Sequence, residues 1–112
     1  MEGYLSVRFS CPAEDVDQWK SILQGLVDQQ WGATLQDRIE YFGHAASSKL
    51  EAIMDNYPME YWYSESWSRT DEGFRFELMT GSLGEGFGKA LAELLDLCRA
   101  KDVKIDVEWD DE

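Results

Sequence analysis

The alternation of apolar and polar side chains near the N-terminus predicts a half-buried β-strand. In the stretch "GYLSVRFS", residues 3–10, the apolar Leu5, Val7 and Phe9 occupy alternate positions. Successive side chains of a strand point to opposite faces, so these three residues are expected on a core face and the residues between them on the other face.

A helical pattern follows this strand. Apolar residues recur mainly at spacings of three and four: Val16, Trp19, Leu23, Leu26 and Val27. Pro12 suits the first position of a helix, and Glu14 and Asp15 suit its first turn, where the helix dipole favours negative charge. Gly32 is expected to end the pattern.

Residues 33–58 are interpreted as an insertion with a less regular pattern. Its first part, "ATLQDRIEYFG", fits a helix and fits a strand almost as well. The following "SSKLEAIMDNYP" predicts a helix, because Ser48 and Glu51 have the spacing of a capping box and Pro58 disfavours continuation. One helix is therefore predicted within the insertion, and the structure of residues 33–44 stays open.

Residues 59–80 predict a β-hairpin. Two alternating runs flank the turn-forming sequence "TDEG". Each run has one aromatic or apolar face: Tyr61, Tyr63 and Trp67 in the first, Phe74, Phe76 and Leu78 in the second. Trp62 and Glu60 are then expected on the opposite face of the first strand.

The C-terminal third predicts a helix and a final strand. The helix has one apolar face, formed by Phe87, Leu91, Leu94 and Cys98. The stretch "VKIDVEWDDE" then alternates strictly, with one apolar face and one charged face. The apolar positions are Val103, Ile105, Val107 and Trp109, and the charged ones are Lys104, Asp106, Glu108 and Asp110. Residues 110–112 form an acidic tail.

The order β-α-insertion-β-β-α-β predicts an α+β protein with the ferredoxin-like split βαβ fold. In this interpretation a four-stranded antiparallel sheet carries helices on one face, and the insertion at about 33–58 adds an extra helix. The length of 112 residues suits a single acidic domain spanning residues 1–112. A fold that supports many unrelated functions does not identify one of them.

The charge balance narrows the classes of partner. The chain has 23 acidic and 10 basic residues, a formal net charge of −13. Such a charge attracts basic partners and opposes direct binding to DNA or RNA, which requires a basic surface. No apolar run reaches the length of a membrane span, so no membrane partner is expected.

The stretch "GSLGEGFGKAL", residues 81–91, has a partial likeness to phosphate-binding loops. A P-loop requires glycine where this chain has Leu83 and a hydroxyl residue where it has Ala90. Glu85 would also place a negative charge near the phosphate. Because Ser82 and Glu85 have capping-box spacing, the stretch is interpreted as the start of a helix. No cofactor is expected.

Catalytic and metal-binding patterns are sparse. The chain has one histidine, His44, and two distant cysteines, Cys11 and Cys98, without CxxC spacing. The cysteines are interpreted as buried small apolar residues in a reducing compartment, which favours the cytoplasm. No catalytic residue, metal site or enzymatic activity is predicted.

The leading hypothesis is a non-enzymatic inhibitor that binds a basic, nucleic-acid-binding surface of a partner protein such as a nuclease. In size and charge alone, the chain is similar to nuclease-immunity, antirestriction and anti-CRISPR proteins of phages and mobile elements. Carboxylates would compete for the Lys and Arg groups that hold phosphates. The expected contact residues are Glu60, Trp62, Glu65, Asp106, Glu108 and Asp110.

Two other hypotheses remain open at the level of sequence. One is a ferredoxin-like domain that binds a small molecule or has a regulatory role, with dimerisation through a sheet edge. The other is an enzyme whose site assembles from residues without a local motif. The oligomeric state and the identity of the target are not encoded in any motif of the chain.

Overall fold

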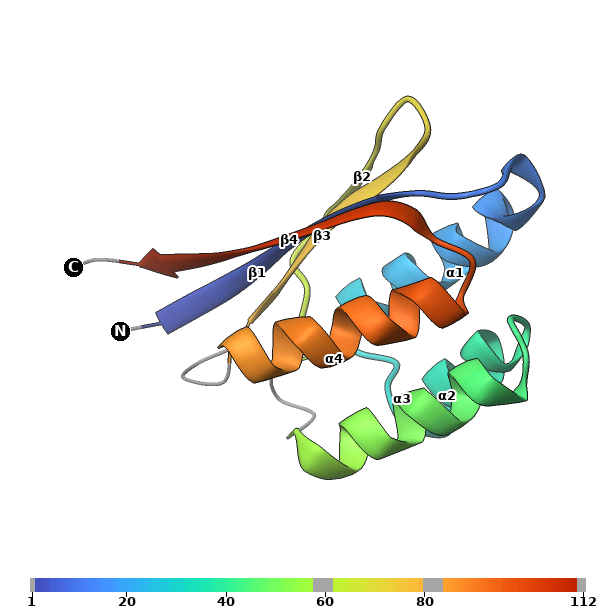
Figure 1. The fold of residues 1–112 in the computed structure, drawn as a ribbon, viewed down its shortest axis with the longest axis horizontal. Coiled ribbons are helices and arrows are strands. Elements are labelled where there is room, and N and C mark those ends of the chain that lie inside the picture. Colours follow the sequence, from blue (N-terminus) through green and yellow to red (C-terminus); the bar gives the residue numbers. More distant parts are fainter. Residues whose placement is uncertain (1, 58–61, 80–83, 111–112) are drawn as a thin grey trace.

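The computed structural model describes residues 2–57, 62–79 and 84–110 (Figure 1). Nine elements follow one another in these ranges. They are β1 (Glu2–Ser10), the 3-10 helix η1 (Ala13–Asp15), α1 (Val16–Val27), α2 (Ala33–Glu40), α3 (His44–Asn56), β2 (Trp67–Arg69), β3 (Gly73–Met79), α4 (Gly84–Leu97) and β4 (Lys101–Asp110).

The four strands form one sheet in the order β2-β3-β1-β4, and all neighbours are antiparallel. At the centre, Val7 of β1 is opposite Phe76 of β3 on one side and Ile105 of β4 on the other. β3 separates β1 from β2, and β1 separates β3 from β4. The α+β class and the four-stranded antiparallel sheet are therefore confirmed.

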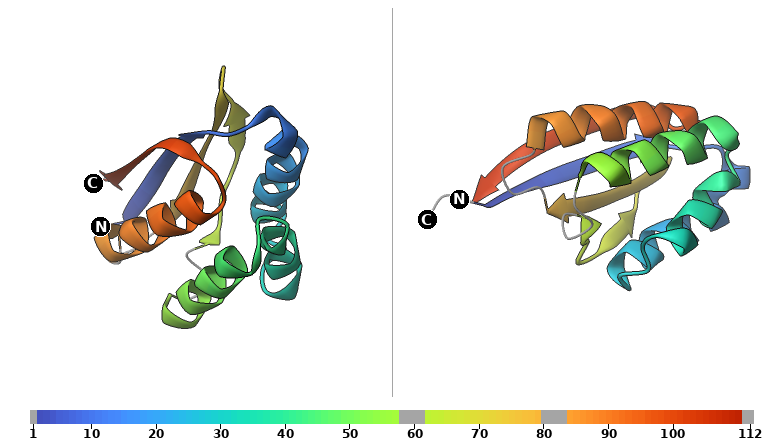
Figure 2. Two further views of the ribbon diagram at one scale, coloured as in Figure 1. Left: turned by 45° about the vertical axis from the view of Figure 1, so that its right-hand side comes forward. Right: turned by 90° about the horizontal axis from the view of Figure 1, so that it is seen from below.

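The described helices lie on one face of the twisted sheet, and no described helix covers the other face (Figures 1 and 2). α4 packs against β4 and β1, while α1 lies near the edge strand β2. α2 and α3 form a further layer, in which α3 packs against α4. This two-sided arrangement gives β1 and β3 one dry face and one face toward solvent.

The core forms between the sheet and the helices, as the alternation of β1 predicts. Leu5, Val7 and Phe9 are at most 1% exposed. The ring of Phe9 lies 4.6 Å from that of Trp19 in α1, measured between centroids. The expected face of β3 is buried as well: Phe74, Phe76 and Leu78. Burying one large apolar side chain contributes about 1.5–3 kcal/mol. The apolar faces therefore determine which side of each strand is directed toward the core.

The insertion contains two helices, so the prediction of one helix is incomplete. The first, ambiguous part folds as α2 with Leu35 and Ile39 buried. α3 begins at His44, and Ser48 therefore lies inside the helix instead of capping it. Gly43 separates the two helices with φ of 116°, a conformation that glycine adopts without strain.

The predicted hairpin is present, but its first strand is much shorter than expected. β2 spans only Trp67–Arg69. The turn matches the prediction: the amides of Thr70 and Gly73 donate to the Gly73 carbonyl and the Thr70 Oγ1, each at 3.0 Å. A Cβ on Gly73 would lie 1.8 Å from the carbonyl oxygen of Phe9, so only glycine fits this close approach.

Candidate functional site

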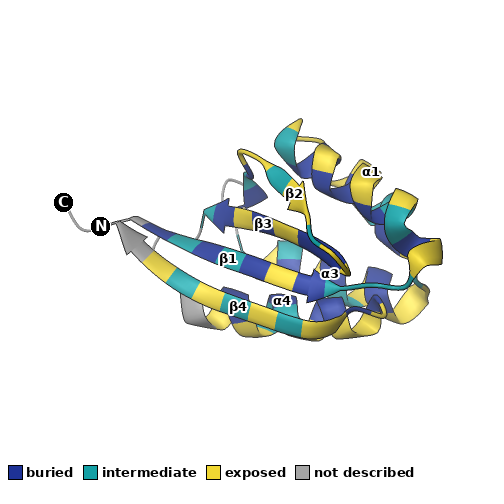
Figure 3. Ribbon diagram, turned by 90° about the horizontal axis from the view of Figure 1, so that it is seen from above, coloured by how far each residue is buried: buried dark blue, intermediate teal, exposed yellow. Residues whose placement is uncertain are grey.

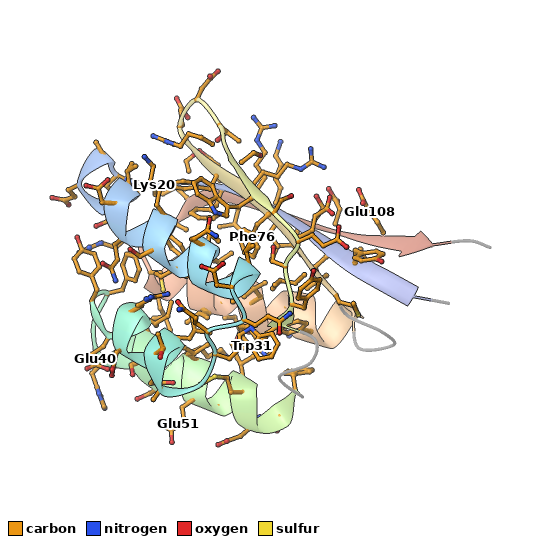
Figure 4. The ribbon with its side chains drawn as sticks, turned by 180° about the vertical axis from the view of Figure 1, so that it is seen from behind. Lys20, Trp31, Glu40, Glu51, Phe76 and Glu108 are labelled. Atoms are coloured by element: carbon orange, nitrogen blue, oxygen red, sulfur yellow. The ribbon has the colours of Figure 1, made fainter. Side chains whose placement is uncertain are left out.

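The candidate site is the uncovered face of the sheet, called here the open face. Its side chains alternate with the core residues along β1, β3 and β4 (Figure 3). In Figure 4, Glu108 projects on the side away from the helices, whereas Phe76 lies between sheet and helices. Along these three strands, the open face includes Tyr4, Ser6, Arg8, Arg75, Glu77, Met79, Lys104, Asp106 and Glu108.

One end of the open face is acidic. Glu77, Ser6 and Asp106 lie opposite one another on three adjacent strands, and Glu108 lies opposite Tyr4 in the next row. The three carboxylates are exposed. Asp106 and Glu108 thus occupy the face that the alternation of the last strand predicts for them. We call Glu77, Asp106 and Glu108 the acidic patch.

The other end of the open face carries a row of cations, which was not predicted. Arg8 of β1 is opposite Arg75 of β3 and Lys104 of β4, and all three are exposed. Arg75 Nη2 lies 3.7 Å from Glu77 Oε1, which links the row to the acidic patch. Like charges directly opposite on a sheet are destabilising, so this row is an unusual feature of an acidic chain. The row of cations depends on the register of the three strands, and register cannot be predicted from a local sequence pattern.

Trp62 does not lie on the open face, so its predicted place on the sheet is wrong. It is 2% exposed, and its ring packs against Phe87 of α4 with centroids 5.1 Å apart. The indole of Trp31 donates to the Trp62 carbonyl at 3.2 Å. Residues 62–66 lie outside β2, so the alternation assumed for a strand does not apply there. Burial of the large apolar indole ring is favourable, and this favours the inward position of Trp62.

The other predicted contact residues have mixed outcomes. Glu65 is exposed, but it precedes β2 and lies outside the strands of the open face. Asp110 is paired with Glu2 at the end of β4, in register with Asp106 and Glu108, and its side chain lies outside the described part. Glu60 lies outside the described residues altogether. The structure therefore brings together two of the six expected residues and adds Glu77.

A buried carboxylate forms a second charged cluster, between the helices. Asp15 is completely buried and accepts two hydrogen bonds from Arg99, at 2.7 and 3.1 Å. The Tyr41 hydroxyl donates to the same carboxylate at 2.9 Å. The hydrogen bond to Asp15 raises the pKa of Tyr41 and of Arg99. Asp15, Arg99 and Tyr41 satisfy one another's charges and hydrogen bonds. We therefore assign this cluster a structural role.

The glycine-rich stretch leads into a helix, as predicted. α4 begins at Gly84, and its Phe87 and Leu91 are buried. A Cβ on Gly88 would lie 3.4 and 3.5 Å from Leu5 and Ile105, which is ordinary van der Waals contact, so this position of the helix faces the sheet. Lys89, the next residue, is exposed. The expected cap at Ser82 lies outside the described residues.

The cysteines and the histidine lie apart from the open face. Burial raises the pKa of the Cys98 thiol to about 12, and it also raises that of the half-buried Cys11. His44 is exposed at the start of α3, 3.4 Å from Ser48 Oγ. Among the described residues, no group of three His, Cys, Asp or Glu side chains has a geometry suited to a metal ion.

The core contains an apolar cavity of about 30 Å³ between the sheet and the helices, lined by residues such as Trp19, Leu50 and Leu91. This is close to the volume that one water molecule occupies in the liquid. A cavity of that size is far below the roughly 300–1,000 Å³ of typical small-molecule sites. This cavity is therefore too small to hold the ligand of a small-molecule-binding domain.

The helices in the described ranges all fall short of the length and apolar character that a bilayer crossing requires. In comparisons with known proteins, no family model, no curated protein and no solved structure matches this chain.

Proposed function

We propose that this protein is a non-enzymatic inhibitor that uses the acidic patch to bind a basic, nucleic-acid-binding surface of another protein. One observation carries the proposal: Glu77 of β3 and Asp106 and Glu108 of β4, the strands on either side of β1, are exposed on a sheet face that no described helix covers. The patch holds the carboxylates on rigid strands, which reduces the entropy lost when a partner binds.

The electrostatics of the chain support this mode of binding. The net charge of −13 steers a basic protein toward the molecule over distances greater than a contact. At contact, the carboxylates would form ion pairs with the partner's Lys and Arg side chains, which otherwise bind nucleic-acid phosphates. The inhibitor would therefore compete with nucleic acid, and its association rate would fall as salt is added.

The topology supports a ferredoxin-like assignment for the fold. In a split βαβ arrangement, the two strands of each βαβ unit are separated by one strand of the other unit. The order β2-β3-β1-β4, with all neighbours antiparallel, meets that condition. We infer a ferredoxin-like domain whose insertion contributes α2 and α3 to the helical side and leaves the open face free.

The loss of Trp62 as a contact residue changes the expected character of the interface. Tyr4 and Met79, both half-buried, are the larger apolar side chains next to the carboxylates. The interface is then dominated by charge, with Tyr4 as the aromatic group best placed for an anchor. Such an interface favours fast, salt-dependent association.

The decisive experiment compares two double charge reversals. Asp106→Lys with Glu108→Lys changes the acidic patch, and Glu51→Lys with Asp55→Lys makes the same change in net charge on the exposed side of α3. A partner is captured with the wild type from a nuclease-treated lysate of the native host and then purified. Its affinity for each variant is measured by calorimetry, with and without competing nucleic acid.

We expect the patch variant to bind at least about tenfold more weakly and the α3 variant to bind almost as well as the wild type. Nucleic acid should displace the protein from its partner. Equal losses in both variants would indicate attraction by net charge alone and would contradict the proposal. A partner that binds nucleic acid and this protein at the same time would contradict it too.

A further inference from the structure

β4 forms a free edge of the sheet. In the order β2-β3-β1-β4, no described segment pairs with its outer side. It is ten residues long, whereas the other edge strand, β2, has three. A long edge strand presents unpaired N–H and C=O groups that can pair with another strand.

The apolar side of this edge is incompletely covered. Val103, Ile105 and Val107 point toward α4 but remain half-buried, whereas Leu5 and Val7 of the neighbouring β1 are fully buried. Further burial of the three β-branched side chains would be favourable, and β-branched residues pair well across antiparallel strands. The edge therefore has both an unpaired backbone and unburied apolar surface.

In one register, the central charges of β4 are complementary to those of a second β4. When two copies pair antiparallel about a two-fold axis at Ile105, Lys104 of each copy lies opposite Asp106 of the other. Ile105 then meets its own copy, and Val103 meets Val107. The centre of the interface then has two opposite-charge pairs on the open face and only β-branched pairs on the core side, while Asp102 lies opposite Glu108 toward each end.

The neighbouring registers are less favourable. A pairing that keeps the two core sides together must be centred on a single residue, because side chains alternate between faces. Centring on Lys104 or on Asp106 places a charge opposite its own copy, and centring on Val107 places Asp106 opposite Glu108. Centring on Val103 also avoids like-charge pairs in the segment from Val103 to Val107, but it pairs only residues 101–105 of each β4, whereas the Ile105-centred register pairs residues 101–109.

We propose that two copies of this chain associate through β4, antiparallel and centred on Ile105, to form a continuous eight-stranded sheet. A two-fold axis perpendicular to the sheet makes this interface self-complementary, as closed dimers require. Both open faces lie on the same side, and Glu77 and Glu108 remain accessible on each copy. The dimer shares Asp106 with the acidic patch, but it is tested on the purified chain without another protein, so its failure is distinguishable from a failure of the proposed function.

The test measures the self-association of the purified protein by analytical ultracentrifugation, from about 1 µM to about 1 mM, a range that spans weak to moderate dimers. Lys104→Asp places like charges opposite each other at two points, and K104D/D106K restores both pairs with reversed signs. Lys20→Asp, on the exposed side of α1, is the matched control for the change in charge. Circular dichroism confirms that each variant is folded.

We expect a wild-type dimer, a dissociation constant raised at least about tenfold by K104D, and recovery in K104D/D106K. The Lys20 variant should dimerise like the wild type. A wild type that stays monomeric throughout the range overturns the proposal. A swap variant that is as weak as the single reversal overturns the register.

Discussion

Arg99 and Asp15, 84 positions apart in the chain, form a two-point ion pair, with Arg99 Nη2 2.7 Å from Asp15 Oδ1 and Nε 3.1 Å from Oδ2. Asp15 precedes α1, and Arg99 follows α4. The guanidinium also lies 5.5 and 5.4 Å from the ring centroids of Tyr41 and Phe42, which follow α2. This pair therefore joins the ends of three helices.

Removing Arg99 should destabilise the fold strongly. Arg99→Ala removes the cation, itself about half exposed, from a completely buried carboxylate, so the unfolding free energy should fall clearly more than when an exposed surface cation is removed. Urea unfolding followed by tryptophan fluorescence measures the loss. Lys20→Ala, which removes an exposed cation, should change the unfolding free energy by at most about 0.5 kcal/mol. Similar losses in both variants would contradict a special role of the pair.

Cys98 should make stability fall at alkaline pH. Its pKa is raised from 9.0 to about 12 by burial, so the native thiol keeps its proton where the unfolded chain has lost it. The unfolded state then binds fewer protons, and the unfolding free energy decreases as the pH rises from about 9 toward 12. Urea unfolding at a series of alkaline pH values should show this decrease, and Cys98→Ala should reduce its slope. An unchanged slope in the variant would argue against the buried thiol as its source.

Leu91 and Leu97 of α4 provide a paired test of the core. Leu91 is 3% exposed and Leu97 is 40% exposed. Leu91→Ala should lower the unfolding free energy by about 2–5 kcal/mol, because it leaves a cavity. Leu97→Ala should cost much less, because its side chain is already partly in water. Equal costs for the two variants would place the packed face of α4 elsewhere.

Nucleotides should not stabilise the protein through the glycine-rich stretch. Lys89 is exposed on α4, and the stretch departs from phosphate-binding motifs at Leu83 and Ala90. The melting temperature should therefore be unchanged by ATP, GTP or NAD at roughly millimolar concentration, and Lys89→Ala should have a mild effect. A clear rise in melting temperature with one nucleotide, abolished in Lys89→Ala, would contradict the interpretation of this stretch as a helix start.

The sequence by itself determined those features that depend on neighbouring residues along the chain. The alternation of Leu5, Val7 and Phe9 identifies the buried face of β1, and that of β4 places Asp106 and Glu108 on the open face. Side-chain direction in a regular strand follows from its twofold period alone, so no tertiary information is required. The same holds for the buried face of α4, which follows the helical period.

The tertiary structure decided the features that depend on residues far apart. Trp62 is buried against Phe87. Its segment lies outside β2, so the alternation of a strand does not predict the direction of its side chain. The cation row forms only because the register of three strands places Arg8 between Arg75 and Lys104. Register and helix packing are selected by the free energy of the assembled core, which local patterns do not report.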